Sequence, residues 1–122
     1  MEGQPEPAKL TAVTTRIRLK PGTVEDCARL FRDTNADLVR DEPDWLSGRM
    51  IFVEAAGEIV VTAIWRSADS YRHYAASARF KEAIARFLPF FAEPPRVSFG
   101  RVLVDMARTP DGDPAIRFLD IG

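Results

Sequence analysis

The chain has 122 residues, of which 46% are hydrophobic and 29% are charged, and this composition is typical of a single globular domain. The formal net charge of −1 argues against a nucleic-acid partner, because such a partner is held by neutralising its phosphates. No apolar run approaches the ~20 residues of a membrane-spanning helix, and no signal peptide is recognisable. We therefore expect a cytoplasmic protein without a membrane partner.

The chain contains a single cysteine, Cys27, and a single histidine, His73. One cysteine cannot form an internal disulfide, which agrees with a reducing compartment. No Cys/His cluster has the spacing of metal ligands, and a lone histidine argues against a zinc or iron site made by protein ligands. We therefore expect no metal.

The first part of the chain predicts a tail, a strand and a helix. Residues 1–9 show no periodicity and are expected to form a loose tail. Residues 10–19 are rich in β-formers and alternate between an apolar face and a wetter face, which is typical of a strand. Thr23 and Asp26 resemble a capping box, so a helix is predicted over residues 23–39.

The apolar stripe of this helix is interrupted by two polar residues, Thr34 and Asn35, beside Phe31. Two interpretations are open. Either both side chains bond the backbone or water, as most buried polar groups do, or they line a cavity.

Two strands are predicted next, over residues 45–54 and 58–65, joined by a tight reversal at Ala-Ala-Gly. In the first of them, strict alternation puts Gly48 and Met50 on one face. The second strand is apolar on both faces apart from Thr62, as expected for a central strand.

A helix follows, with Ser67 as its N-cap, and Ser77 breaks it or caps a second piece over residues 78–91. Pro89 is expected to loosen the last turn, and Pro-Pro ends the helix. Residues 96–106 predict a fourth strand. Residues 107–122 are treated as a C-terminal extension that contains a turn-forming Thr-Pro-Asp-Gly-Asp-Pro segment.

The order of elements is therefore β-α-β-β-α-β over residues 10–106. The right-handed crossover rule favours an α+β, ferredoxin-like fold, with a four-stranded antiparallel sheet that both helices cover on one face. The other face still carries apolar residues, so a partner sheet is expected, and a homodimer supplies it.

Several segments together resemble a known family. They are the Leu-Lys-Pro-Gly turn, the Glu-Pro-Asp-Trp-Leu entry to the second strand, and the spacing of Trp65, Ser67, Tyr71, Ser77 and Phe80. Over residues 10–106 the chain is similar to the antibiotic biosynthesis monooxygenase-type family of dimeric α/β barrels. Members of that family include quinone-forming oxygenases, haem degraders and isomerases.

Two departures from the family pattern bear on the chemistry. Many members have a histidine nine residues after the strand-ending tryptophan, but Tyr74 stands there in this chain and the histidine is His73. One residue turns a helical side chain by about 100°, so His73 is expected to point away from Tyr71 and Tyr74. The haem-degrading branch also uses an asparagine in the first strand, where this chain has Thr15, and haem cleavage is therefore the weaker interpretation.

Each candidate site residue also has a purely structural interpretation. Trp65 is either a core anchor or a pocket wall that donates a hydrogen bond. Tyr71 and Tyr74 are three residues apart, so both can face the sheet. Burying two hydroxyls requires partners for them, which slightly favours a polar cavity over a plain core. The phenylalanines on the helical stripes are more typical of a core than of a ligand wall.

The hypothesis is a small dimeric oxygenase without any cofactor that oxidises an aromatic, polyketide-like phenol to a quinone. The substrate supplies the electrons, and the protein holds the ring, relays a proton and excludes water. Trp65 and Tyr71 would bond the substrate oxygens, and Tyr74 would help to relay the proton. The predicted substrate-binding residues are Asn35, Phe31, Phe87, Phe91 and His73. The alternatives are a small-molecule-binding dimer without turnover and an isomerase or cyclase.

Overall fold

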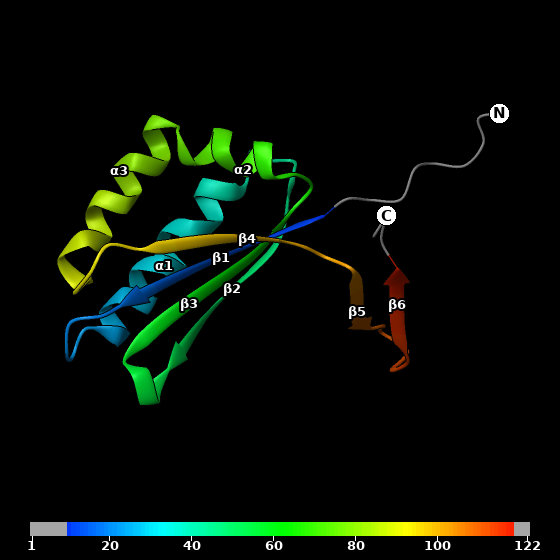
Figure 1. The fold of residues 1–122 in the computed structure, drawn as a ribbon, viewed down its shortest axis with the longest axis horizontal. Helices are drawn as coiled ribbons and strands as arrows, with labels where there is room; N and C mark the ends of the chain where they lie inside the picture. The colour runs from blue at the N-terminus through cyan, green and yellow to red at the C-terminus, as the bar shows by residue number, and fades with distance from the viewer. Residues whose placement is uncertain (1–9, 119–122) are drawn as a thin grey trace.

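The computed structural model describes residues 10–118, so the tail expected for residues 1–9 lies outside the described residues, as do residues 119–122. The elements follow the predicted order, with an additional hairpin at the end (Figure 1). The strands are β1 (Thr11–Arg18), β2 (Trp45–Val53), β3 (Glu58–Trp65), β4 (Arg96–Arg101), β5 (Val104–Arg108) and β6 (Pro114–Phe118). The helices are α1 (Val24–Val39), α2 (Ala68–Ala75) and α3 (Ala78–Phe87), with short 3-10 turns η1 (Glu54–Ala56) and η2 (Leu88–Phe90).

The central sheet has the strand order β2-β3-β1-β4. β1 pairs antiparallel with β3, from Thr11 opposite Trp65 to Arg18 opposite Glu58, and its other edge pairs antiparallel with β4. The helices lie on one face of this sheet (Figure 1). The predicted ferredoxin-like α+β fold is confirmed.

The serines begin the helices as predicted, but the threonine does not. The Ser67 hydroxyl accepts a hydrogen bond from the Ser70 backbone N–H at 3.1 Å, and Ser77 accepts one from Phe80 at 3.2 Å. Thr23 makes no side-chain cap, because its hydroxyl donates to the Lys20 carbonyl at 2.8 Å. The predicted capping box is therefore wrong, although the helix begins where it was expected.

The helix predicted over residues 78–91 is shorter in the structure. α3 ends at Phe87, and residues 88–90 form a 3-10 turn that contains Pro89. The predicted loosening near Leu88 is confirmed, since proline cannot donate the next helical hydrogen bond. Phe91 already forms a β-bridge with Leu19, so the chain leaves the helix before Pro94 and Pro95.

The strand predicted over residues 96–106 is divided in two. Val102 donates to the Leu10 carbonyl at 2.9 Å, and after this bond the chain leaves β1. β5 then pairs with β6 as a separate two-stranded sheet that projects from the rest of the molecule (Figure 1). The prediction of one strand is wrong here, because the alternation of residues cannot show where a pairing partner ends.

The hairpin reverses at the predicted Thr-Pro-Asp-Gly-Asp-Pro turn. The Thr109 N–H donates to the Asp113 carbonyl at 2.7 Å, and Gly112 supplies a φ of 95°.

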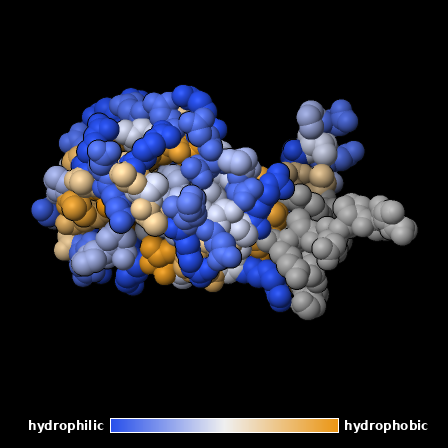
Figure 2. Space-filling view, turned by 90° about the horizontal axis from the view of Figure 1, so that it is seen from above, coloured by the Kyte–Doolittle hydropathy of each residue, from blue (hydrophilic) through white to orange (hydrophobic). Residues whose placement is uncertain are grey.

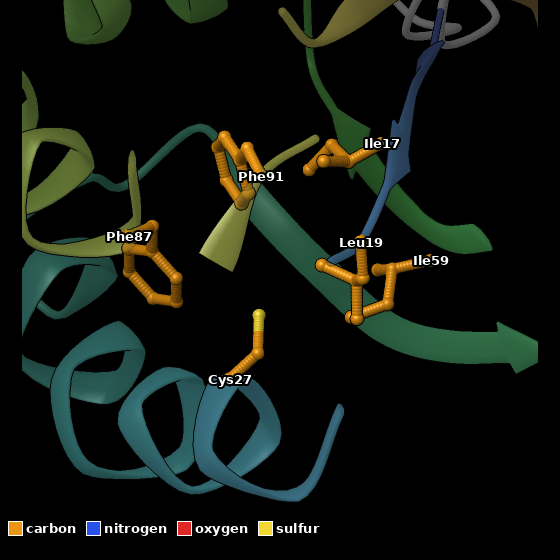
Figure 3. Close-up of a cluster of buried hydrophobic side chains, with 6 residues drawn as sticks. All are labelled: Ile17, Leu19, Cys27, Ile59, Phe87 and Phe91. Atoms are coloured by element: carbon orange, nitrogen blue, oxygen red, sulfur yellow. The ribbon is translucent and has the colours of Figure 1, made fainter. Parts of the chain in front are cut away.

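Most of the buried side chains among the described residues form two clusters between sheet and helices. One contains Val13, Val39, Trp65 and Tyr74. The other contains Ile17, Leu19, Cys27, Ile59, Phe87 and Phe91. Figure 3 shows the Cys27 side chain rising from α1 into the space between Phe87 and Leu19.

Seen from the side of α2 and α3, the surface is mostly hydrophilic, with apolar side chains in separate patches (Figure 2). The apolar stripes of these helices face the sheet, as the predicted amphipathic pattern requires. None of the helices within residues 10–118 has the length and hydrophobicity needed to span a bilayer.

Candidate functional site

A cavity of about 330 Å³ lies between the sheet and the helices. Its walls come from both buried clusters. Tryptophan and tyrosine side chains line one end of the cavity, and phenylalanine side chains line the other. Among the described residues that line it, none carries a charge. Such a small, mostly apolar cavity with a few polar groups is typical of a small-molecule site.

One end of the cavity is built by Trp65, Tyr71 and Tyr74. Trp65 ends the central strand β3 and is 1% exposed, while both tyrosines lie on the inward face of α2. The Trp65 ring lies 5.7 Å from the Tyr71 ring and 5.1 Å from the Tyr74 ring, and the two tyrosine rings are 6.4 Å apart. The strand-to-helix turn at Ser67 brings these three rings together.

The polar atoms of these three side chains make no hydrogen bond within the described part of the protein. No hydrogen bond among residues 10–118 involves the Trp65 indole N–H or the hydroxyls of Tyr71 and Tyr74. Among the described residues, no side-chain nitrogen or oxygen is both fully buried and without a hydrogen bond. These three atoms are therefore at least slightly exposed. The three donors are thus not sealed in the core, and the side chains that carry them line the cavity, where a ligand could supply acceptors.

Burial raises the pKa of both tyrosines. The pKa of Tyr71 is raised by desolvation, and the pKa of Tyr74 is raised to about 12 by desolvation, with further contributions from Glu42 and Tyr71 that Arg79 partly offsets. Both hydroxyls therefore keep their protons at neutral pH. They act as hydrogen-bond donors rather than as bases.

Trp45 also lines the cavity, and the sequence analysis did not identify it as a site residue. Strict alternation along β2 places Trp45 on the same face as Ser47, away from the helices. A register shift between Trp45 and Ser47 reverses this, so that Trp45 pairs opposite Trp65 and shares its face. Gly48 lies beside the Trp45 ring, and a Cβ there would be in ordinary van der Waals contact with it, 3.4 Å from Cζ2.

The other end of the cavity is apolar and is lined by Phe31, Phe87, Phe91 and Cys27. The rings of Phe87 and Phe91 are stacked with centroids 6.3 Å apart. Cys27 is 1% exposed, and burial raises the pKa of its thiol to about 11. A thiol in this state is not a nucleophile at neutral pH.

Thr34 and Asn35 both line the cavity, in the middle of α1. The Thr34 hydroxyl donates to the Leu30 carbonyl at 2.8 Å, so for Thr34 both interpretations from the sequence hold. No hydrogen bond is present between the Asn35 amide and another residue of the described range. Asn35 is therefore a further polar side chain at the wall of the cavity that a ligand can reach.

His73 is exposed on α2 and does not line the cavity. The helical phase explains its position, since its neighbour Tyr74 is turned inward and is 6% exposed. Of the residues predicted for the site, the structure brings all except His73 to one cavity.

The side of the cavity next to β4 is thinly covered. Val97 lines the cavity and is 45% exposed, while the neighbouring Phe99 is 43% exposed. Phe99 packs edge-on against Tyr71, and the Arg72 guanidinium lies 4.8 Å from the centre of the Phe99 ring. This contact joins α2 to the edge strand, and nothing in the local sequence indicates it.

No group of three or more His, Cys, Asp or Glu side chains that could hold a metal ion occurs within residues 10–118. The residues that line the cavity offer hydrogen-bond donors and apolar walls, which can hold an aromatic ring with one or two oxygens.

A family model described as antibiotic biosynthesis monooxygenase matches residues 11–86 of this chain. No curated protein matches the sequence. Among solved structures, the chain is similar to a protein from Caulobacter crescentus that is provisionally called an antibiotic biosynthesis monooxygenase. The TM-score is 0.69 and the identity 21%, over 78% of this chain and 91% of that one.

A protein from Bordetella bronchiseptica with the same provisional description has a TM-score of 0.70 and 20% identity, over 77% of this chain and 97% of that one. Another, from Nitrosomonas europaea, has a TM-score of 0.68 and 12% identity, over 83% and 96% of the two chains. Identities this low show a shared fold and leave the chemistry to be argued from the cavity.

Proposed function

Because this chain belongs to the antibiotic biosynthesis monooxygenase family, we propose that it oxidises a small aromatic phenol of polyketide type to a quinone, without a metal, flavin or other cofactor. The observation that carries the proposal is the group of unused donors, from Trp65, Tyr71 and Tyr74, at one end of an otherwise apolar cavity. A flat ring fills the apolar part, while its oxygens reach the donors.

In this reaction the substrate supplies the electrons. A phenol that has lost its proton reduces O₂ by one electron, and the two radicals combine at the ring carbon to form a peroxide. The peroxide then loses water, so that the ring C–H becomes C=O. In total, one phenol and one O₂ give one quinone and one water.

The protein's part is to bind, orient and exclude water. Trp65 and Tyr71 donate to the substrate oxygens, where negative charge develops, and such fixed donors act strongly in a dry cavity. Tyr74 keeps its proton at neutral pH, so it delivers a proton to the leaving oxygen and regains one afterwards. Asn35 and the three phenylalanines Phe31, Phe87 and Phe91 hold the ring in place.

We also propose that the protein is a cytoplasmic homodimer. The helices leave the other face of the sheet open, and there Ile51 is 41% and Val53 37% exposed. The start of the β5–β6 hairpin also exposes apolar side chains, since Leu103, just before β5, is 48% exposed and Val104 and Met106 are 46% and 58% exposed. A second copy packed on this face would bury both surfaces.

Oxygen consumption tests the proposed oxidation. Purified protein is mixed with 1-naphthol or a dihydroxyanthracene, and O₂ uptake is followed together with quinone absorbance. We expect uptake that falls on the order of a hundredfold in Trp65→Phe and Tyr71→Phe, as for the loss of one oxyanion donor. His73→Ala is the matched control, because His73 lies on the same helix but outside the cavity.

The same assay separates the alternatives. Equal uptake by the wild type and both variants would overturn the proposal for these substrates. Binding without product under air would favour a non-catalytic binding protein, and product formed under strictly anaerobic conditions would favour an isomerase or cyclase.

A further inference from the structure

Asp44 ties together three separate segments at the aromatic end of the cavity. Its carboxylate accepts a hydrogen bond from the Ser70 hydroxyl at the start of α2, and its other oxygen lies 3.7 Å from Nε of Arg66, just after β3. Its backbone carbonyl accepts from the Arg66 N–H at 2.8 Å. Asp44 itself immediately precedes β2.

Asp44, Arg66, Ser67 and Ser70 form one hydrogen-bond network, and the hydroxyl protons of its two serines can be arranged in only one way. Ser70 has one hydroxyl proton, and it donates that proton to the acceptor-only carboxylate of Asp44. The hydroxyl contact of 2.9 Å between Ser67 and Ser70 must therefore be a donation from Ser67 to Ser70. Ser67 in turn accepts the Ser70 backbone N–H, so every group in the network has a partner.

Three residues of the network are chain neighbours of cavity aromatics. Asp44 precedes Trp45, and Ser70 precedes Tyr71. Arg66 follows Trp65. These three aromatic side chains come from β2, β3 and α2, and no hydrogen bond joins them within the described part of the chain. Their relative placement therefore depends on ring packing and on links between the segments that carry them.

We propose that Asp44 is a positioning residue that sets the mutual orientation of Trp45, Trp65 and Tyr71. The inference rests on the proposed function for its consequence in turnover, but the orientation itself can be measured without any substrate. A ligand reaches these donors only if the three segments hold their spacing, since a small displacement of a binding group sharply reduces its effect.

The bond to Ser70 is the stronger part of the link. The side chains of Arg66 and Asp44 are 60% and 41% exposed, and an exposed ion pair of this kind contributes little. The Ser70 hydroxyl is partly buried, and a hydrogen bond to a charged acceptor is stronger than one between neutral groups. Removing the Asp44 carboxylate or the Ser70 hydroxyl should therefore disturb the orientation of the three aromatic rings to a similar extent.

The test compares Asp44→Ala, Asp44→Asn and Ser70→Ala in the full-length protein. Near-ultraviolet circular dichroism reports the orientation of the tryptophans and tyrosines, and far-ultraviolet circular dichroism reports the fold. We expect Asp44→Ala and Ser70→Ala to change the near-ultraviolet spectrum while the far-ultraviolet spectrum stays unchanged. Asp44→Asn keeps an acceptor oxygen, so it should restore much of the wild-type signal. The dissociation constant for 1-naphthol should rise about tenfold in Asp44→Ala.

Asp26→Asn is the matched control. Asp26 also precedes a cavity residue, Cys27, and forms an ion pair with Arg29 at 3.0 Å, but both partners belong to α1. This variant should leave the near-ultraviolet spectrum and the dissociation constant unchanged. If Asp44→Ala and Ser70→Ala both keep the wild-type near-ultraviolet spectrum, the positioning role is wrong. If the spectrum changes while the protein turns over no phenol, the positioning role stands and the proposed oxidation fails.

Discussion

The rings of Trp65 and Tyr74 lie 5.1 Å apart with their planes tilted by 38°, although one residue ends a strand and the other lies near the end of a helix. Both rings are almost completely buried, yet the indole N–H and the phenol O–H make no hydrogen bond within the described residues. This pair combines the packing of a core with the free donors of a binding site.

Tyr74→Phe separates these two roles. The hydroxyl has no partner to lose, so we expect the free energy of unfolding to change by less than about 1 kcal/mol. Phenol oxidation should fall on the order of a hundredfold, because the proton donor is gone. Urea unfolding and O₂ uptake measure the two effects. Full turnover in Tyr74→Phe would exclude the hydroxyl from the chemistry.

Tyr74→Ala is the contrasting variant. It removes a ring that packs against Trp65 and against Phe80 at 5.0 Å, so it should reduce the free energy of unfolding by about 3–5 kcal/mol.

Tyr74 also predicts a loss of stability at alkaline pH. The pKa of this phenol is raised from 10.0 to about 12 in the folded protein, mainly by desolvation, so the folded state favours the protonated form. Its contribution is complete below the unfolded pKa and is lost as pH rises through the folded pKa. We expect the free energy of unfolding to fall by on the order of 2 kcal/mol between about pH 10 and pH 12.

Denaturant unfolding at a series of pH values measures this fall, and Tyr74→Phe should flatten part of it. The Cys27 thiol titrates in a neighbouring range, since its pKa is raised from 9.0 to about 11. The comparison is therefore best made in a Cys27→Ala background. An unchanged slope in Tyr74→Phe would contradict the assignment to Tyr74.

Gly48 is predicted to limit the space beside Trp45. Alanine at this site would place its Cβ 3.4 Å from Cζ2 and 3.5 Å from Nε1 of the indole, which is ordinary van der Waals contact, so the added methyl group fits beside the ring but takes up space at the wall of the cavity. We expect Gly48→Ala to change the tryptophan fluorescence and to weaken naphthol binding severalfold. Gly100→Ala is the control on the same sheet, because a Cβ there meets no atom within 4 Å.

Gly57→Ala should reduce the stability of the fold without affecting the cavity. Gly57 has a φ of 61° in the turn before β3, where an L side chain is strained. We expect a loss of about 1 kcal/mol in the free energy of unfolding without any change in ligand affinity.

Cys27 should react with thiol reagents only when the protein opens. Its side chain is 1% exposed between α1 and the phenylalanine end of the cavity, and its raised pKa leaves little thiolate at neutral pH. The labelling rate with a disulfide reagent should increase with low concentrations of urea. Bound naphthol should slow it, since Cys27 lines the same cavity. Fast labelling of the native protein would show that the cavity is open at this end.

The β5–β6 hairpin tests the proposed dimer. Leu103→Asp with Met106→Asp places charges on two exposed apolar positions, one just before β5 and one within it, so we expect the dimer to dissociate to monomers in sedimentation equilibrium. Leu88→Asp is the control, since Leu88 is 53% exposed in the turn after α3, away from both proposed surfaces. Dimers in the double variant would show that the hairpin is not required for association.

Local patterns in the sequence predicted every element of the central fold. The alternation in β1, the apolar strand β3 and the caps at Ser67 and Ser77 depend on neighbouring residues, and the structure contains them where they were expected. Helical phase also separates Tyr71 and Tyr74 on one face of α2 from His73 on another, and the packing of the helix on the sheet decides that the tyrosine face is the inward one.

Other features could be decided only by the tertiary structure, because they depend on which strands meet. The place of Trp45 in the cavity depends on a register shift against β3, and the division between β4 and β5 depends on where β1 ends. The bond from Ser70 to Asp44 spans 26 residues, and the contact of Phe99 with Tyr71 crosses from sheet to helix. Periodicity thus determined the elements and the faces they present. The pairing register and the long-range contacts determined the cavity, because they follow from how the whole chain packs.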